Sequence, residues 1–193
     1  MTPSHELPSL QSERLVLRWP LATDQDELYA IFSNPEAMRY WSCPPYADRQ
    51  QAAALIEDIH QHCRQRDLFQ WAIEHRTDQR VIGTCTLAWL DWSNQRAEIG
   101  FILHPQYWRQ GYISEALTRL LDHAFDDLEL YRIEADVDPA NQASIRTLER
   151  LGFCHEGRLR ERWLVGGQRC DSDFYGLLKP QWDARRTADS HVD

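Results

Sequence analysis

The segment from Tyr107 to Ala116 constrains the fold of this chain more than any other stretch of its sequence. A short apolar run, Ile99 to Leu103, stops at His104-Pro105, and a loop with consecutive Arg, Gln and Gly residues follows it. Beyond this loop, apolar residues recur at the spacing of an amphipathic helix. They are Ile113, Ala116, Leu117, Leu120, Leu121, Ala124 and Phe125. The segment therefore predicts a strand, a glycine-bearing loop and the start of a helix in direct succession.

This succession predicts an anion-binding turn at Gly111. The amides of a helix's first turn have no partners inside the helix, and the helix dipole places partial positive charge at the same end. Because Gly111 has no side chain, a phosphate group can approach the backbone closely at that position. We therefore expect a phosphorylated ligand to bind at this turn.

Length, charge and cysteine content narrow the possible classes of protein. With 193 residues, the chain is long enough for one α/β domain with a full core. Its formal net charge of -9 argues against nucleic-acid binding, which needs a basic surface. The five cysteines form no Cys-x-x-Cys pair, which argues against a zinc site or a disulfide framework and suits a reducing compartment. Because neither a secretion signal nor a membrane-length apolar run is visible, we expect a cytoplasmic protein.

Apolar periodicity and turn residues predict the order of the elements. Strands are expected at residues 14–19, 69–74, 81–90, 96–103, 132–137, 154–163 and 169–178. Helices are expected to begin after Thr23 or Asp24, after Asp48, at the Gly111 turn and after Asn141. This order predicts an α/β (α+β) three-layer fold, in which a mixed central sheet of about seven strands carries helices on both faces. We expect one domain at residues 12–182, a flexible leader at 1–11 and a polar, frayed tail at 183–193.

Four stretches of the sequence resemble motifs of one enzyme superfamily. They are Glu13–Arg18, Ala97–Leu103, Tyr107–Leu117, and Asn141–Ser144 together with Leu-Gly-Phe at 151–153. In order and spacing they resemble the GNAT superfamily of acetyl-CoA-dependent N-acetyltransferases. The closest resemblance is to the RimJ/RimL-like subgroup, which includes ribosomal-protein N-terminal acetyltransferases. Each stretch alone is a weak signal, but all of them in order are a strong one, and they imply a GNAT-like fold over nearly the whole chain.

Two residues of the loop depart from the superfamily pattern, which is usually written Arg/Gln-x-x-Gly-x-Gly/Ala. Trp108 occupies the first position, where the subgroup tolerates an aromatic residue, and Ile113 occupies the last. Because Ile113 belongs to the apolar stripe of the predicted helix, we expect its side chain to point into the core.

The resemblance implies that acetyl-CoA is the cosubstrate, with no metal expected. Backbone amides of the loop would hold the pyrophosphate, with Arg109 adding positive charge. The pantetheine arm would pair with the backbone of the preceding strand, as an added strand does. Asn141, already the natural cap of its helix, would also form a hydrogen bond to the cofactor. The implied cofactor-binding residues are Phe101, Ile102, Leu103, Arg109, Gln110, Gly111, Tyr112, Ile113, Ser114 and Asn141.

The resemblance also implies two catalytic residues. Glu98 would accept the proton of the attacking amine as a general base, directly or through water. A glutamate on a half-exposed strand can equally be one half of a salt bridge, and the sequence leaves both readings open. Ser144 would protonate the departing thiolate, although a serine in the first turn of a helix can also be an ordinary helix residue.

Several aromatic residues are candidates for the acceptor pocket. Tyr40 and Trp41 lie in an aromatic, proline-broken loop and are expected to line that pocket, where they could hold a cationic amine. Trp71 and Trp89 lie within predicted strands, so we expect them to pack in the core.

These expectations together indicate a transferase that moves the acetyl group of acetyl-CoA to a primary amine. The acceptor that the subgroup favours is a protein N-terminal α-amine of the ribosomal-protein type. A small-molecule acceptor (a polyamine, amino acid or antibiotic) and a non-catalytic acyl-CoA-binding module stay open as alternatives. A Rossmann nucleotide-binding domain fits poorly, because a meander precedes the loop and the loop lacks Gly-x-Gly-x-x-Gly. We expect no nucleic-acid or membrane partner, and the sequence is compatible with a homodimer without fixing the oligomeric state.

Overall fold

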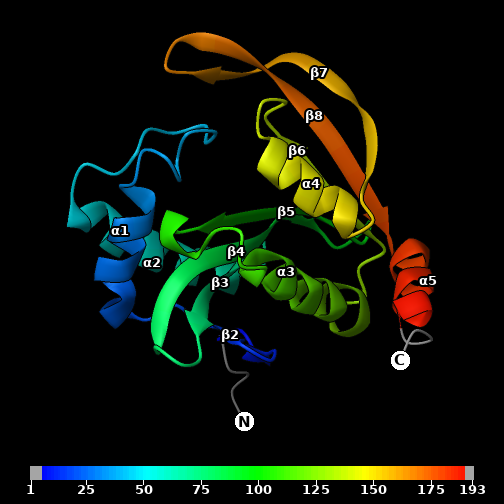
Figure 1. Ribbon diagram of the computed structural model, residues 1–193, viewed down its shortest axis with the longest axis horizontal. Coiled ribbons are helices and arrows are strands. Elements are labelled where there is room, and N and C mark those ends of the chain that lie inside the picture. The colour runs from blue at the N-terminus through cyan, green and yellow to red at the C-terminus, as the bar shows by residue number, and fades with distance from the viewer. Residues whose placement is uncertain (1–5, 190–193) are drawn as a thin grey trace.

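The computed structural model describes residues 6–189, which fold around one eight-stranded mixed sheet (Figure 1). The strands are β1 (Leu10–Gln11), β2 (Leu15–Arg18), β3 (Leu68–His75), β4 (Arg80–Asp91), β5 (Arg96–Leu103), β6 (Arg132–Val137), β7 (Cys154–Val165) and β8 (Gln168–Leu178). The helices are α1 (Gln25–Phe32), α2 (Arg49–Gln65), α3 (Tyr112–Asp122), α4 (Gln142–Arg150) and α5 (Lys179–Asp189). The predicted α/β fold class is confirmed.

The two ends of the chain differ from the expectation. The leader was predicted at 1–11, but Leu10–Gln11 forms β1 and pairs with β2, which adds a strand to the expected sheet. Leu10 is buried in the core, and this burial fixes a segment that its polar surroundings had marked as loose. The rest of the predicted leader and tail, at 1–5 and 190–193, lies outside the described residues.

The strand order is β1-β2-β3-β4-β5-β6-β8-β7. Strands β1 to β5 pair antiparallel with their neighbours, so the predicted meander is confirmed. Strand β6 then pairs parallel with β5, but only where Arg96–Glu98 face Arg132–Glu134. Beyond Glu98 and Glu134 the two strands share no pairing in the part of the chain that the structure describes. We call this point of divergence the fork.

Helices cover both faces of the sheet. On the face formed by Ala97, Ile99 and Leu103, α3 and α4 close the larger core (Figure 1). On the opposite face, α1 and α2 pack a smaller core against residues that include Ile102. The alternation predicted along β5 is therefore confirmed. Between residues 6 and 189, no helix combines the length and the apolar character that a bilayer crossing would need.

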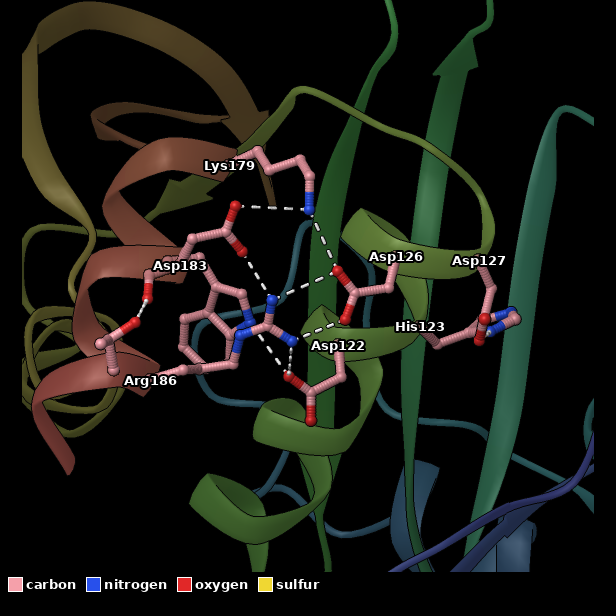
Figure 2. A network of polar contacts seen from close by, with 9 residues as sticks. Asp122, His123, Asp126, Asp127, Lys179, Asp183 and Arg186 are labelled. Carbon is pink, nitrogen blue, oxygen red and sulfur yellow. Dashed lines mark hydrogen bonds and ion pairs between the residues drawn. The ribbon is translucent and has the colours of Figure 1, made fainter. Parts of the chain in front are cut away.

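The predicted polar tail is in fact helical as far as Asp189. It was expected to fray because residues 183–193 are polar. Helix α5 is instead fixed by Trp182, which is 2% exposed, lies beside Phe125 and donates its indole N–H to Asp122. Arg186 adds ion pairs to Asp122 and Asp126, as Figure 2 shows. The buried Trp182 and the ion pairs of Arg186 thus hold α5 in place, although its last residues are polar.

Strands β7 and β8 form a long hairpin that rises above the rest of the molecule in Figure 1. Its turn is made by Gly166 and Gly167, whose φ values of 56° and 82° both lie in the left-handed region that hairpin turns of this length favour. A register shift between Leu159 and Trp163 bends β7 partway along the hairpin. The hairpin therefore carries side chains such as Arg162 back toward the fork.

Candidate active site

The Gly111 turn (residues 109–114) has the backbone shape expected of an anion site. Gly111 is the N-cap of α3 with φ of 82°, a conformation that favours glycine, and no side chain caps this helix end. The first intrahelical bond runs from the Glu115 amide to the Gly111 carbonyl, at 3.1 Å. The amides of Tyr112, Ile113 and Ser114 precede that bond, so the helix itself leaves them available to a ligand.

The two residues that depart from the superfamily pattern have structural roles here. The Trp108 indole N–H donates to the Leu103 carbonyl at 2.7 Å and so ties the loop to the end of β5. Ile113 is partly buried against the larger core, in agreement with the expectation that it faces inward. Neither side chain fills the space beside Gly111: the atom nearest to a Cβ built there is the Nη2 of Arg14, at 3.4 Å.

The fork gives β5 one free edge. Phe101, Ile102 and Leu103 pair with β4 on one side, whereas on the other side β6 has already diverged. The backbone groups on that side face no strand within residues 6–189. A free strand edge binds an extended ligand through backbone hydrogen bonds, which is what these positions were expected to offer to a pantetheine arm.

Glu98 is the last residue of β5 that pairs with β6, and its carboxyl group has unusual surroundings. It is half-buried and makes no hydrogen bond or ion pair to any residue between 6 and 189. Burial raises the pKa of Glu98 to about 7, and the negative charges of Asp136 and Glu134 add to the rise, whereas Arg162 opposes it. The salt-bridge reading left open by the sequence is therefore not what the structure has.

The two neighbouring carboxylates, by contrast, are both paired. Glu134 accepts hydrogen bonds from Arg96 at 2.9 Å and from Arg132 at 2.8 Å. Asp136 accepts from Arg162 at 2.7 Å, and also from Trp163 and Ser172. The acidic face at the fork therefore contains one carboxylate, that of Glu98, whose charge is not directly compensated.

Asp136 and Arg162 act electrostatically on Glu98, and neither was named as a candidate site residue from the sequence. The alternation of acidic residues along 132–137 was visible, so the face that Asp136 occupies could have been inferred. No signal of that kind marks Arg162, because it reaches Asp136 only through the bend in β7. At this bend Glu161 adopts a left-handed φ of 52° and its amide donates to Asp171.

Helix α4 begins at Gln142, soon after β6 ends at Val137. The side-chain oxygen of Asn141 accepts a hydrogen bond from the Ser144 amide at 3.2 Å, so the predicted cap is confirmed. The Asn141 side-chain N–H groups have no partner among residues 6–189 and remain available to a ligand. The hydroxyl group of half-buried Ser144 likewise makes no hydrogen bond within the described range. Both residues thus take part in the cap of α4, while the Asn141 side-chain N–H groups and the Ser144 hydroxyl stay available to a ligand.

The aromatic candidates separate into different environments. Trp41 packs edge-on against Phe32, with ring centroids 5.6 Å apart, and so supports the smaller core as well as the loop. Tyr40 is half-exposed, with the Arg39 guanidinium 5.4 Å from its ring centroid. Trp71 is fully buried, as expected. The prediction for Trp89 is wrong: it is 75% exposed, because a bulge in β4 takes it out of the strand's alternation.

Comparison with known proteins identifies an acetyltransferase family. Residues 14–154 match the family model described as Acetyltransferase (GNAT) domain. The uncharacterised N-acetyltransferase p20 of Bacillus licheniformis is 36% identical over 176 residues, which cover 91% of this chain and 99% of that protein. Spermidine N(1)-acetyltransferase of Escherichia coli is 28% identical over 142 residues, or 73% of each chain.

A solved structure extends the likeness to three dimensions. It comes from Vibrio cholerae and is provisionally named a ribosomal-protein-serine acetyltransferase. It matches with a TM-score of 0.79 and 26% identity, and covers 92% of this chain and 99% of that one. The free amides of the Gly111 turn and the free edge of β5 fit the diphosphate and the pantetheine arm of coenzyme A. The chain therefore belongs to the GNAT family, and it is an acetyl-CoA-dependent N-acetyltransferase.

Proposed function

We propose that this enzyme acetylates protein N-terminal α-amines, with Glu98 as the general base and Ser144 as the general acid. The observation that carries the proposal is the unpaired, half-buried carboxyl group of Glu98 at the fork. A base with a pKa of about 7 is half ionised near neutral pH, where proton transfer in both directions is efficient. A structural carboxylate would instead be paired, as Glu134 and Asp136 are.

In a direct transfer of the acetyl group from acetyl-CoA to the amine, the residues around the fork have separate roles. The Gly111 turn and the edge of β5 hold acetyl-CoA so that its thioester lies at the fork, and this positioning supplies much of the rate. The amine nitrogen forms a bond to the carbonyl carbon as the carbon–sulfur bond breaks, and Glu98 accepts the proton that the nitrogen loses. The Ser144 hydroxyl donates a proton to the departing sulfur and regains one from water. Backbone N–H groups of β5 stabilise the negative charge that develops on the carbonyl oxygen.

The charges at the fork support an α-amine over a polyamine. A polyamine carries several positive charges, and several uncompensated carboxylates would favour its binding. Here Glu134 and Asp136 are already neutralised by arginines, which leaves Glu98 as the one unpaired carboxylate of this face within residues 6–189. The Vibrio cholerae structure named for ribosomal-protein acetylation agrees with this choice. The spermidine acetyltransferase relative is the reason to test the alternative directly.

The test measures release of free coenzyme A thiol from acetyl-CoA with several acceptors. The acceptors are peptides with the N-terminal sequences of ribosomal proteins, the same peptides with blocked α-amines, spermidine, and a panel of amino acids and amine antibiotics. We expect kcat/KM to be highest for the free peptides and to disappear when the α-amine is blocked. A higher kcat/KM for spermidine would replace the peptide acceptor with a polyamine.

A third outcome would point to another class of protein. If acetyl-CoA raised the Tm of the protein but no acceptor released thiol, the acceptor would lie outside this panel and the proposed α-amine acceptor would be wrong. Mass spectrometry of the acetylated peptide, which locates the added acetyl group on the α-nitrogen, completes the assignment.

A further inference from the structure

Arg14, just before β2, reaches across to the Gly111 turn and touches it on both sides. Its Nη1 donates to the Gln110 carbonyl at 3.0 Å, and its guanidinium lies 4.4 Å from the centre of the Tyr112 ring. Its Nε donates to Glu115, one turn into α3, at 2.7 Å. One side chain therefore contacts the residue before Gly111, the residue after it and the first turn of the helix.

These contacts also stabilise the ionised form of Glu115. A negative carboxylate in the first turn suits the helix dipole but repels a bound anion. Burial works against ionisation of Glu115, but hydrogen bonds from the Arg14 amide, the Ser12 hydroxyl and the Arg14 side chain outweigh it and lower its pKa. Glu115 is thus ionised, and Arg14 compensates its charge beside the anion site.

One donor group of Arg14 is left over. Its Nη2 makes no hydrogen bond or ion pair in the described part of the chain, and it is the group that lies 3.4 Å from a Cβ built on Gly111. It therefore faces the space that glycine leaves open in the turn. The Arg14 side chain is 40% exposed, so a ligand in that space can reach it.

Arg18, four residues later in the same motif, shows the contrast. Its Nη1 and Nη2 both donate to Asp24, and its Nε donates to Glu74. All three of its nitrogens are engaged in holding β2 to its neighbours. Of these two motif arginines, only Arg14 keeps a nitrogen for a ligand.

We propose that Arg14 is a binding residue for the diphosphate of acetyl-CoA, which it contacts through Nη2 while its other contacts hold the Gly111 turn in shape. The proposal rests on the assignment of that turn to the cofactor. A guanidinium beside backbone amides adds charge-assisted hydrogen bonds to a phosphate oxygen that the amides alone do not supply.

The test separates the diphosphate from the rest of the cofactor. Calorimetry measures the Kd of coenzyme A for the wild type, Arg14→Gln, Arg14→Lys and the control Arg76→Gln. Arg76 is exposed and also binds the N-terminal segment, through the carbonyls of Ser12 and Glu13, but forms no hydrogen bond or ion pair with α3 in the described part of the chain. We expect Arg14→Gln to raise the Kd about tenfold or more and Arg14→Lys to raise it less, whereas Arg76→Gln leaves it within about twofold.

A second arm uses acetyl-pantetheine, a substrate that has the thioester but no diphosphate. The kcat/KM for acetyl-pantetheine should stay within about twofold in Arg14→Gln, because the lost contact is absent from this substrate. An equal loss with acetyl-pantetheine would show a general defect of the fold and overturn the proposal, and so would an unchanged Kd for coenzyme A.

The variant Glu115→Gln tests the same charge balance without changing Arg14, so the test does not depend on the folding of an Arg14 variant. It leaves Arg14 in place and removes the opposing charge, so coenzyme A should bind at least as tightly as in the wild type; weaker binding would contradict the proposed charge balance. If the wild type itself bound no coenzyme A, the cofactor assignment of the turn would fail, and the proposal for Arg14 with it. If the wild type bound coenzyme A and the Arg14 variants bound it with the same Kd, only the proposal for Arg14 would be overturned, and the cofactor assignment of the turn would stand.

Discussion

Two clusters of carboxylates in this enzyme are built in opposite ways. Between α5 and the end of α3, Asp122, Asp126 and Asp183 surround Arg186, and Lys179 contacts two of them (Figure 2). At the fork, arginines neutralise Glu134 and Asp136, but Glu98 has no such partner among residues 6–189. In the first cluster every carboxylate is paired with a cationic side chain, and we call it the closed cluster. In the second cluster the Glu98 carboxylate has no such partner among residues 6–189, and we call it the open cluster.

The difference appears in the pKa values. Hydrogen bonds from Arg186 lower the pKa of Asp126, so its carboxylate is charged at neutral pH. Burial and neighbouring negative charge raise the pKa of Glu98 to about 7, so its charge changes near neutrality. The closed cluster fastens a helix, whereas the open one can exchange a proton with a substrate. The comparison predicts that the two clusters respond in opposite directions when they are mutated.

The largest expected effect is on catalysis by Glu98→Gln. Removal of a general base should lower kcat by about 100-fold or more, while the Kd for acetyl-CoA stays close to that of the wild type. In the wild type, kcat/KM should rise with pH through about 7, since Glu98 of the free enzyme must lose its proton before it can accept one. This limb of the pH profile should vanish in the variant.

Glu149→Gln is the matched control, because Glu149 is an exposed glutamate on α4 with no part in the site. It should keep both the kcat and the pH limb of the wild type. If the activity of Glu98→Gln still rose with pH near 7, another group would be responsible for that rise, and Glu98 would not be the general base.

Ser144→Ala should have a smaller effect on the same reaction. We expect kcat to fall about tenfold to 100-fold with little change in cofactor affinity, since the hydroxyl acts only on the departing sulfur. The cap of α4 survives, because the bond to Asn141 comes from the Ser144 backbone amide. The Tm should therefore stay near the wild-type value. A loss of kcat that disappeared with a thioester of a more acidic thiol would support the proton-donor role, and an unchanged kcat would remove Ser144 from the chemistry.

Sequence reasoning recovered those parts of the fold that local patterns encode. The apolar stripe of α3, the caps at Asp48 and Asn141, and the alternation along β5 are all short-range signals, and the structure has each of them. Helix α5 was missed because its stability comes from contacts with α3, about 60 residues earlier in the chain, and not from its own periodicity.

The site shows the same limit. Glu98 and Ser144 could be named as candidates because they belong to motifs, but the environment of Glu98 could not be predicted. That environment depends on Arg162, which a bend in β7 brings to Asp136, and on the end of pairing between β5 and β6. Trp89 was misplaced because a bulge in β4 breaks the period that a strand pattern assumes.

The open cluster should also reduce stability. A raised carboxyl pKa means that the folded state holds the proton more tightly than the unfolded chain, so stability falls as pH rises from the unfolded value of about 4.3 toward 7. Glu98→Gln should therefore be more stable than the wild type at about pH 8, by roughly 1–2 kcal/mol after solvent screening. The gain should vanish at about pH 3, where Glu98 is neutral in both states. Urea unfolding at the two pH values measures the difference, and a gain independent of pH would mean that charge is not its cause.

Arg186→Gln should act in the opposite sense, with the smallest effect. The cluster is partly exposed, so we expect a loss of about 1 kcal/mol in the free energy of unfolding near neutral pH. Because the pKa of Asp126 is lowered in the folded state, this contribution is present above the unfolded value of about 3.9 and is lost as pH falls through the folded one. The difference from the wild type should also shrink in about 1 M salt. Arg185→Gln, an exposed neighbour on α5, is the control, and equal losses in both variants would show that the closed cluster does not fasten the helix.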